Sequence, residues 1–535
     1  MIRAEIKKLI QEAIRSHWDV DLELAEIKID YPPEGFGDYS TNAAMSLAKI
    51  AKSNPLEIAE DIASEILKQV QDGMFIEIKV VKPGFINFYL APEFIRQAIV
   101  DINKEKDNFG NLDIGKEKKV QVEFISANPT GPLTLGNGRG GFYGDVLANI
   151  LAKAGFNIER EYYVNDVGEQ IKKLGHSVIG DDQAVYKGEY IDKLLRKLDS
   201  RLRENDNLNT ESVGKEAVKI IMEEMIKPTI EGKMEIKFDN YFNENSLYES
   251  GEVEKIIDYL KEKNLTERKE DALWFKATQF GDDKDRVLVK ADGEKTYLAS
   301  DVAYLKNKFE RGFDKLIYIW GADHHGYVSR LKAAAKALEY NPDDVEIIIM
   351  QLVRLISKGK EVRMSKREGT YVEIEKLIDE VGLDVARFFF LMYSPGAHMN
   401  FDLDLAKERS QKNPVYYVQY AYARICSILD KSKNEREKTG KNLGLLNHDS
   451  ELKLIKQLIK FPEVIEDIAH DYQVHSLSHY ALDLVKIFHK FYESCRVIDE
   501  KNPDLTQARL FLVEVTKIVL KNTLDLMGIF APEKM

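Results

Sequence analysis

The sequence of 535 residues contains only two cysteines, Cys426 and Cys495, and both lie within apolar helical patterns. Disulfide frameworks and cysteine-based zinc sites need more thiols at closer spacing, so neither is expected, and a reducing compartment fits. No run of eighteen apolar residues occurs, which argues against a membrane-spanning helix. The first residues are amphipathic and include acids, unlike a secretory signal or a transit peptide. We therefore expect a cytoplasmic protein without a membrane partner.

An excess of positive charge is also lacking, since the formal net charge is −13. This balance argues mildly against a protein that binds nucleic acid over its whole surface, and no DNA partner is expected. It leaves room for local basic faces that bind RNA. The 44% hydrophobic and 31% charged residues are typical of a soluble globular protein, and the length favours about three domains.

Apolar periodicity divides the chain into three parts. Residues 1–115 combine helical patterns with two alternating strand patterns, which predicts a small α+β module. Residues 116–395 alternate strands with helices and predict a doubly wound parallel sheet of the α/β, Rossmann-like class, interrupted by a helical insertion at about 170–250. Residues 396–535 show only long helical patterns and predict an all-helical domain.

The most informative stretch runs from residue 120 to residue 150. A strand pattern at 120–125 leads into the breaker-rich turn NPTGP, then into LTLGNGRGG, and a helical pattern starts at Phe142. A strand, a glycine-rich turn and a helix N-terminus together favour an anion, because free N–H groups and the helix dipole point at it. The glycines alone are a weak signal, since glycine turns are common.

A second basic feature is SKGKEVRMSKREGT at residues 357–370. A basic loop is more often a solvated surface. Here Met364, Ser365 and Lys366 stand between basic residues in a glycine-bounded loop after a strand pattern. Cations placed over a triphosphate would neutralise the charge that develops when the α-phosphate is attacked.

These two strings, in this order and about 230 residues apart, resemble the two signatures of the class I aminoacyl-tRNA synthetases. Their flanks resemble the bacterial arginyl-tRNA synthetases, as do EYYVND, KTYLASDVAY, YIWGADHHGY, GFGDYSTNAAM, KPGFINF, YVQYAYARICSIL and the closing LMGIFAPEKM. The resemblance covers essentially the whole chain. It implies ATP-dependent activation of arginine and its transfer to tRNA. The residues implied in catalysis are Thr134, Asn137, Ser365 and Lys366, and those implied in ATP binding are Gly136, Asn137, Arg363, Met364 and Lys366.

The resemblance also implies an arginine site. A guanidinium is recognised by planar carboxylates, and Tyr297 and Asp301 are four residues apart, so on a helix they share one face. Taken alone, Tyr297 is more simply a core tyrosine and Asp301 a surface acid. The residues implied in arginine binding are Glu123, Asn128, Tyr297, Asp301 and His324.

Cofactors and partners follow from the same resemblance. ATP with its Mg²⁺ is expected, whereas His324 and His325 lack a suitably spaced third ligand, so no zinc or other metal site is expected. The partners are L-arginine and the tRNA for arginine, contacted by the N-terminal module and by the helical domain. Tyr416, Tyr420 and Arg424 suit contact with unstacked bases, although each could equally be helix packing. We expect a monomer.

One departure from the family pattern concerns Thr134 and Asn137, where histidines are usual. Threonine and asparagine can donate hydrogen bonds but cannot carry positive charge. This departure leaves open a tRNA-binding paralogue or regulator with weakened catalysis. A weaker alternative, which does not depend on these two residues, is a class I synthetase for another amino acid. The acids Glu123 and Asp301 favour a cationic substrate over the latter.

Overall fold

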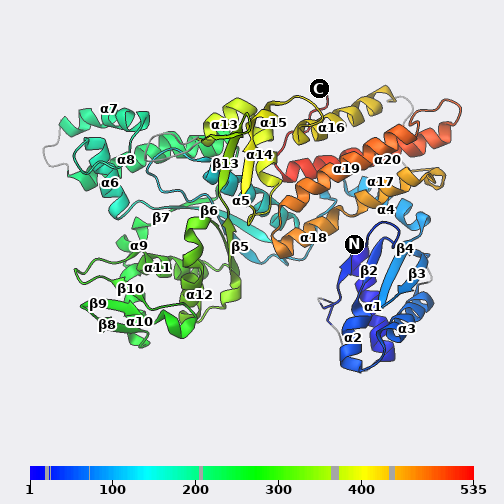
Figure 1. Ribbon diagram of the computed structural model, residues 1–535, viewed down its shortest axis with the longest axis horizontal. Helices are drawn as coiled ribbons and strands as arrows, with labels where there is room; N and C mark the ends of the chain where they lie inside the picture. The colour runs from blue at the N-terminus through cyan, green and yellow to red at the C-terminus, as the bar shows by residue number, and fades with distance from the viewer. Residues whose placement is uncertain (19–22, 25, 71–72, 204–208, 363–372, 433–439) are drawn as a thin grey trace.

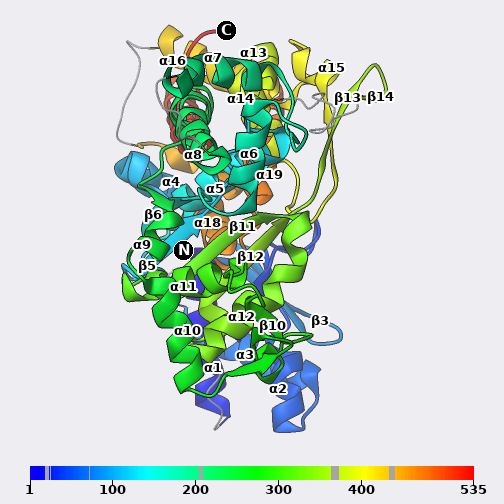
Figure 2. The same ribbon diagram turned by 90° about the vertical axis from the view of Figure 1, so that its left-hand side faces the viewer.

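A five-stranded parallel sheet lies at the centre of the chain, with strand order β12-β11-β5-β6-β7 (Figures 1 and 2). The computed structural model describes residues 1–535 except 19–22, 25, 71–72, 204–208, 363–372 and 433–439. The strands are β5 (Lys119–Glu123), β6 (Asn157–Val164), β7 (Asn240–Asn243), β11 (Lys315–Gly321) and β12 (Val345–Met350). The chain winds outward from β5 to β7 and then returns to the other side of β5, so the predicted doubly wound fold is confirmed.

Helices cover both faces of this sheet because side chains alternate along a strand. On β11, Ile317 and Ile319 face one hydrophobic core, which includes α5 (Leu135–Lys153), whereas Leu316 and Tyr318 face a second. The second core is formed with α10 (Glu252–Glu262), α11 (Tyr297–Glu310) and α12 (Val328–Ala337). The reversal of winding between β5 and β11 leaves a crevice beyond their carboxyl ends, which is where such sheets bind ligands.

Helix α5 begins at Leu135, seven residues before the start that apolar spacing predicted at Phe142. The early start has a local cause, because Thr134 caps the helix and its glycine-rich first turns are buried. An idealised Cβ on Gly144 would lie 2.3 Å from the ring of Phe124, so only glycine permits this close packing of α5 on the end of β5. The glycine-rich residues from Leu135 to Gly141, predicted as a turn, are therefore part of the helix itself.

The N-terminal module is a four-stranded antiparallel sheet, β1-β2-β4-β3, with helices packed against it. Its elements are α1 (Ile2–His17), β1 (Ile29–Asp30), β2 (Tyr39–Thr41), α2 (Ala43–Ala51), α3 (Pro55–Gln69), β3 (Phe75–Val81), β4 (Phe85–Leu90), α4 (Pro92–Glu105) and the 3₁₀ turn η1 (Lys106–Asn108). A buried polar network joins it to α18 (Phe461–Asp471), where Arg3 pairs with Asp467 and the Tyr31 and Tyr39 hydroxyls donate to Glu463. Helix α18 in turn packs on α5.

Two segments are inserted between strands of the central sheet. The first follows β6 and contains α6 (Glu169–Ile179), α7 (Glu189–Arg203), α8 (Thr210–Ile221) and two π-helical turns, η2 (Met222–Ile226) and η3 (Thr229–Lys233). It ends before β7, so β7 and α9 (Asn245–Glu249) lie outside the insertion although the sequence analysis included them at 170–250. The second holds an antiparallel sheet of β8 (Thr266–Lys269), β9 (Ala272–Phe275) and β10 (Arg286–Val289), with η4 (Ala277–Phe280).

The remaining residues form a small sheet and a helical domain. The sheet joins β13 (Val353–Ser357), β14 (Lys360–Val362) and β15 (Met399–Asp402), so the expectation that strands end before residue 396 is wrong at β15. The other short elements are η5 (Ala322–Tyr327), η6 (Pro342–Asp344), α13 (Ile374–Val381), α14 (Leu383–Leu391), α15 (Leu403–Lys407) and η7 (Leu443–Leu445). The helical domain contains α16 (Pro414–Lys431), α17 (Asp449–Ile459), α18, α19 (His475–Ser494) and α20 (Pro503–Leu526).

Candidate active site

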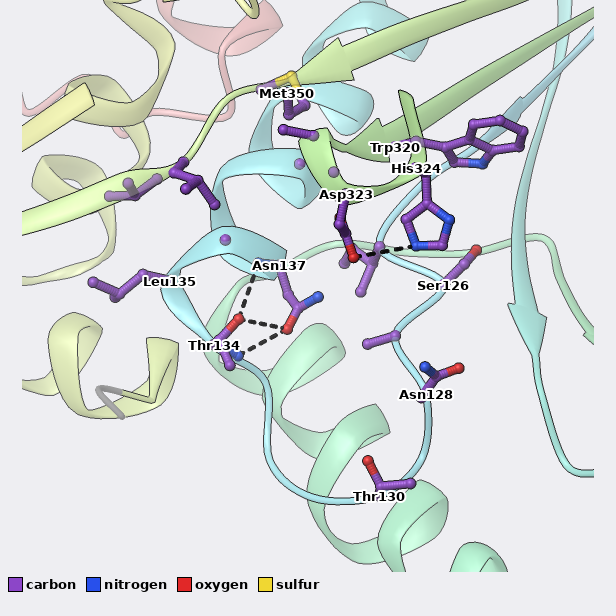
Figure 3. A pocket seen from close by; sticks show the side chains of 18 of the residues that line it. Ser126, Asn128, Thr130, Thr134, Leu135, Asn137, Trp320, Asp323, His324 and Met350 are labelled. Carbon is purple, nitrogen blue, oxygen red and sulfur yellow. Dashed lines mark hydrogen bonds and ion pairs between the residues drawn. The ribbon is translucent and has the colours of Figure 1, made fainter. Parts of the chain in front are cut away.

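A cavity of about 810 Å³ opens at the carboxyl ends of β5, β11 and β12 (Figure 3). Its wall is built from the turn after β5, the first turn of α5, the η5 turn after β11 and the residues after β12. The insertion contributes its outer side through α6 and the loop that follows. The volume lies within the range of small-molecule sites in proteins.

The turn after β5 is sharply bent. Ile125 and Ser126 have φ angles of 64° and 35°, a left-handed region that β-branched residues such as isoleucine rarely adopt. The bend is stabilised because the Ser126 N–H donates to Phe124 O at 2.9 Å and the Tyr163 N–H donates to Ser126 Oγ at 3.1 Å. It directs the following residues, including Asn128 and Thr130, along the cavity wall (Figure 3). Such strain is concentrated at functional sites.

Thr134 and Asn137 form a reciprocal cap at the N-terminus of α5 (Figure 3). The Thr134 hydroxyl and the Thr134 N–H both donate to Asn137 Oδ1, at 2.8 and 2.9 Å. The Asn137 N–H lies 3.5 Å from Thr134 Oγ1. Because Asn137 Oδ1 is occupied as an acceptor, its amide NH₂ is the end that faces the cavity (Figure 3). A site for an anion results, made of neutral donors.

Arg139 connects α5 to the opposite wall of the cavity through hydrogen bonds. The buried guanidinium donates to the main-chain carbonyls of Gln351, Ser394 and Ala397 at 2.6, 2.8 and 2.9 Å. Burial lowers the pKa of Arg139 to about 10. The residues after β12 that line the cavity are therefore held against the same helix that presents Thr134 and Asn137.

The residues predicted to act in catalysis or to bind ATP and arginine divide into three groups. Asn128, Thr134, Gly136, Asn137 and His324 all line the cavity. Glu123, Tyr297 and Asp301 do not line it but gather beside it, around the carboxyl ends of β5 and β6 and the start of α11. The residues of the second basic string, Arg363, Met364, Ser365 and Lys366, lie outside the described residues.

Two acids of the second group, Glu123 and Asp301, lie near a further acid, Glu244, and we define these three residues as the acidic chamber. Glu244 was missed in the sequence, because the stretch up to residue 250 was read as an insertion. The available signal was its place directly after the short aromatic strand NYFN, which is β7. Its carboxylate is buried and accepts from the Ser300 hydroxyl at 2.7 Å, while Glu244 Oε2 and Asn165 Oδ1 lack a normal hydrogen bond among the described residues.

The charge of the acidic chamber is only partly compensated. Glu123 forms a buried ion pair with Lys308, whose Nζ lies 2.6 Å from Glu123 Oε2. Burial raises the pKa of Glu244 to about 7. Burial, with the neighbouring charges of Glu244 and Glu123, raises the pKa of Asp301 to about 8, against a weaker opposing effect of Arg330. Lys308 thus compensates Glu123, whereas neither Glu244 nor Asp301 forms an ion pair among the described residues.

His324 stands at the other edge of the cavity. Its Nε2 lies 3.5 Å from the exposed carboxylate of Asp323, and its ring packs between Trp320 and Tyr327, at 6.0 and 5.6 Å between centroids. In the described part of the chain, no cluster of three or more histidine, cysteine, aspartate or glutamate side chains could hold a metal ion. None of the described helices is long and apolar enough to cross a bilayer.

Tyr416, Tyr420 and Arg424 lie along one face of α16, remote in sequence from the cavity. The two tyrosine rings are stacked, with centroids 6.2 Å apart and planes 7° apart. Arg424 donates to the Tyr420 hydroxyl at 2.7 Å and covers the Tyr420 ring. All three side chains stay partly exposed, so this aromatic and basic strip is accessible to a partner.

Comparisons with known proteins match three consecutive family models. These are the arginyl-tRNA synthetase N-terminal domain at residues 4–90, the class I (R) tRNA synthetase catalytic domain at 98–388 and the DALR anticodon-binding domain at 418–535. The arginine–tRNA ligase of Caldanaerobacter subterraneus is 44% identical, with 100% of this chain and 99% of that protein covered. The arginine–tRNA ligase of Carboxydothermus hydrogenoformans is 45% identical, with 97% of this chain and 95% of that protein covered. The structure of Thermus thermophilus arginyl-tRNA synthetase superimposes with a TM-score of 0.81, at 21% identity over 100% of both chains.

The acidic chamber predicts an unusual dependence of stability on pH. A carboxyl group whose pKa is higher in the folded than in the unfolded state destabilises the fold as pH rises between the two pKa values. For Asp301 these are 3.8 in the unfolded state and about 8 in the folded state. Asp301→Asn should therefore raise the unfolding temperature relative to wild type at pH 9 but change it little at pH 4. Thermal unfolding followed by circular dichroism at both pH values tests this. An equal shift at both would contradict the raised pKa.

Proposed function

Since the chain belongs to the arginyl-tRNA synthetase family, we propose that its cavity takes ATP and that the adjoining acidic chamber takes the guanidinium of arginine. The activity is that of an arginine–tRNA ligase: arginine and ATP form arginyl-adenylate with release of pyrophosphate, and the arginyl group passes to the terminal ribose of tRNA. The observation that carries the proposal is the position of a cation-deficient acidic chamber next to a capped helix N-terminus. A cationic amino acid and an anionic nucleotide are complementary to these two ends.

The nucleotide end is proposed to act through hydrogen bonds and position. The Asn137 amide NH₂ and the first N–H groups of α5, including that of Gly136, would donate to phosphate oxygens, with the helix dipole favouring the negative charge. Thr134 is proposed to orient Asn137 through the reciprocal cap. Arg363, Met364, Ser365 and Lys366, which lie outside the described residues, are proposed to cover the phosphates from the second signature.

The arginine end is proposed to act through charge. Asp301 and Glu244 would pair with the guanidinium, because theirs are the carboxyl groups with raised pKa values. Glu123 is proposed to act with Lys308, which already pairs with its carboxylate. The remaining residues proposed to contact arginine are Asn128, Tyr297 and His324. With both substrates held, the arginine carboxylate attacks the α-phosphate in line, and positioning replaces acid–base chemistry.

Magnesium is proposed to enter with ATP. The carboxylate on the cavity wall is that of Asp323, which is exposed and not part of a metal-binding cluster among the described residues. This donor set fits an ion held mainly by substrate phosphates and water, which is the usual mode for magnesium. When bound, the ion would neutralise phosphate charge.

The three parts of the chain are proposed as functional units: 1–115 contacts tRNA, 116–395 is catalytic, and 396–535 reads the anticodon, through Tyr416, Tyr420 and Arg424. The match of 418–535 to an anticodon-binding domain supports this division. The network from Arg3 and Tyr31 to α18 supports one continuous tRNA surface across both ends of the chain. We propose that the protein acts as a monomer in the cytoplasm.

The decisive experiment is ATP–pyrophosphate exchange with and without arginine and its tRNA. We expect exchange that depends strictly on arginine, since the acidic chamber selects a guanidinium. Lysine in place of arginine serves as the control, because its ammonium cannot pair with two carboxylates in the same planar geometry. Absence of exchange in every mixture, with tRNA still bound in a salt-dependent way, would instead identify a regulator with a degraded site.

The acidic chamber predicts that arginine binding is weakened by acid. A carboxyl group must be ionised to pair with guanidinium, so the arginine KM should rise as pH falls below about 8, the raised pKa of Asp301. Glu244→Gln should raise the arginine KM about 10- to 100-fold, which corresponds to the loss of one charge-assisted hydrogen bond. It should also reduce the pH dependence of this KM. Asp258→Asn, an exposed acid of α10 paired with Lys261, is the matched control. An unchanged KM for Glu244→Gln would remove this residue from the site.

The strip on α16 predicts a loss of tRNA affinity without loss of substrate binding. Tyr416→Ala should weaken tRNA binding by about 1–3 kcal/mol if a base stacks on the ring. Arg424→Met should in addition reduce the dependence of binding on salt. Ser427→Ala, on an exposed position of the same helix, is the control. Unaltered tRNA affinity in both variants would identify the strip as helix packing only.

A further inference from the structure

A lysine of the insertion lines the same cavity as the residues proposed to bind phosphate. Lys173 lies on α6 one turn after Gln170, and both line the same cavity as Thr134, Gly136 and Asn137. Among the described residues, it is the only lysine or arginine on that wall. Thr134 and Asn137 supply neutral donors, so the described wall holds one permanent positive charge.

The helix that carries Lys173 is fixed rather than free to swing. An idealised Cβ on Gly175 would lie 1.8 Å from Thr210 O, and one on Gly214 would lie 2.1 Å from Ile171 O. Helices α6 and α8 therefore touch backbone to backbone at two points where any larger residue would force them apart. This contact defines the position and rotation of α6, and with them the position of the Lys173 backbone at the cavity.

A second set of contacts joins this helix to the turn of the first signature. The Ser177 hydroxyl donates to Lys173 O at 2.7 Å and accepts from the N–H groups of Val185 and Tyr186 at 3.0 and 2.9 Å. Val185 and Tyr186 themselves line the cavity. Farther along the same segment, the Tyr190 hydroxyl donates to Thr130 O at 2.9 Å. The insertion is thereby bound to the wall that it completes.

The neighbouring lysine shows that the free charge is specific to Lys173. Lys172 is paired with Glu169 at 3.0 Å on the helix exterior. No close ion pair of the Lys173 ammonium is found in the described part of the chain, and Glu169 influences it only at longer range. An unpaired cation beside an anion site has its counter-charge supplied by the ligand.

We propose that Lys173 binds the β- and γ-phosphates of ATP, and the pyrophosphate released from it, supplying the positive charge that Thr134 and Asn137 lack. This inference rests on the proposed binding of ATP in the cavity. It assigns a substrate-binding role to the insertion, which otherwise forms only the outer wall of the site.

The test compares nucleotide binding by Lys173→Met, Lys173→Arg and the adjacent control Lys172→Met in the full chain. Equilibrium affinities for ATP and AMP are measured without arginine or tRNA. Lys173→Met should bind ATP about 10- to 100-fold more weakly than wild type, which corresponds to the loss of one charge-assisted hydrogen bond. Its affinity for AMP should be unchanged. Lys173→Arg should restore most of the ATP affinity, and Lys172→Met should match wild type. The KM for pyrophosphate in the reverse reaction should rise in parallel.

The outcomes separate this inference from the proposed function. Failure of the wild-type protein to bind ATP would overturn the ATP site itself. If the wild-type protein binds ATP and Lys173→Met binds it with the same affinity, only the role of Lys173 is overturned. An equal loss of ATP and AMP affinity in Lys173→Met would identify a packing role and would also overturn it. Thermal unfolding of each variant identifies any global loss of structure.

Discussion

The arrangement of the active site depends on one buried guanidinium. Arg139 donates to three main-chain carbonyls that belong to two separate segments, and no carboxylate pairs with it among the described residues. Carbonyl groups left without donors in a closed interior are costly, so both segments are held to α5. Since α5 also presents Thr134 and Asn137, the positions of both cavity walls are set by the same helix. Catalysis by positioning requires this kind of fixed geometry.

The two ends of the site handle charge in opposite ways. At the proposed nucleotide end, the first turn of α5 offers neutral donors and a helix terminus, which favour an anion. At the proposed arginine end, Glu244 and Asp301 are buried at a cost, which appears in their raised pKa values. Pairing with a guanidinium would compensate this buried charge, so the proposed specificity comes from the cost of burying the two acids without a counter-charge as well as from new contacts.

The sequence predicted the fold class because strands, of which β11 and β12 are compact and mostly apolar runs, alternate with helical patterns along the chain. Residues of the first family signature line the cavity. The sequence misplaced features that depend on tertiary contacts. Helix α5 begins at Leu135 because its glycines are buried against Phe124 and other neighbours, although glycine-rich segments are poor helices in isolation. Glu244 was missed because the four-residue strand before it is too short to show a period. The pairing of Glu123 with Lys308 joins residues 185 positions apart, which periodicity cannot reveal.

The chamber has a consequence for the lifetime of the protein. A ligand that binds only the folded state stabilises it in proportion to the logarithm of its concentration. At the proposed site the ligand would also compensate carboxyl groups that are buried at a cost, so the protein without arginine is the form most exposed to unfolding and proteolysis. A supply of arginine thus does two things at once: it provides the substrate, and it preserves the molecule that consumes it.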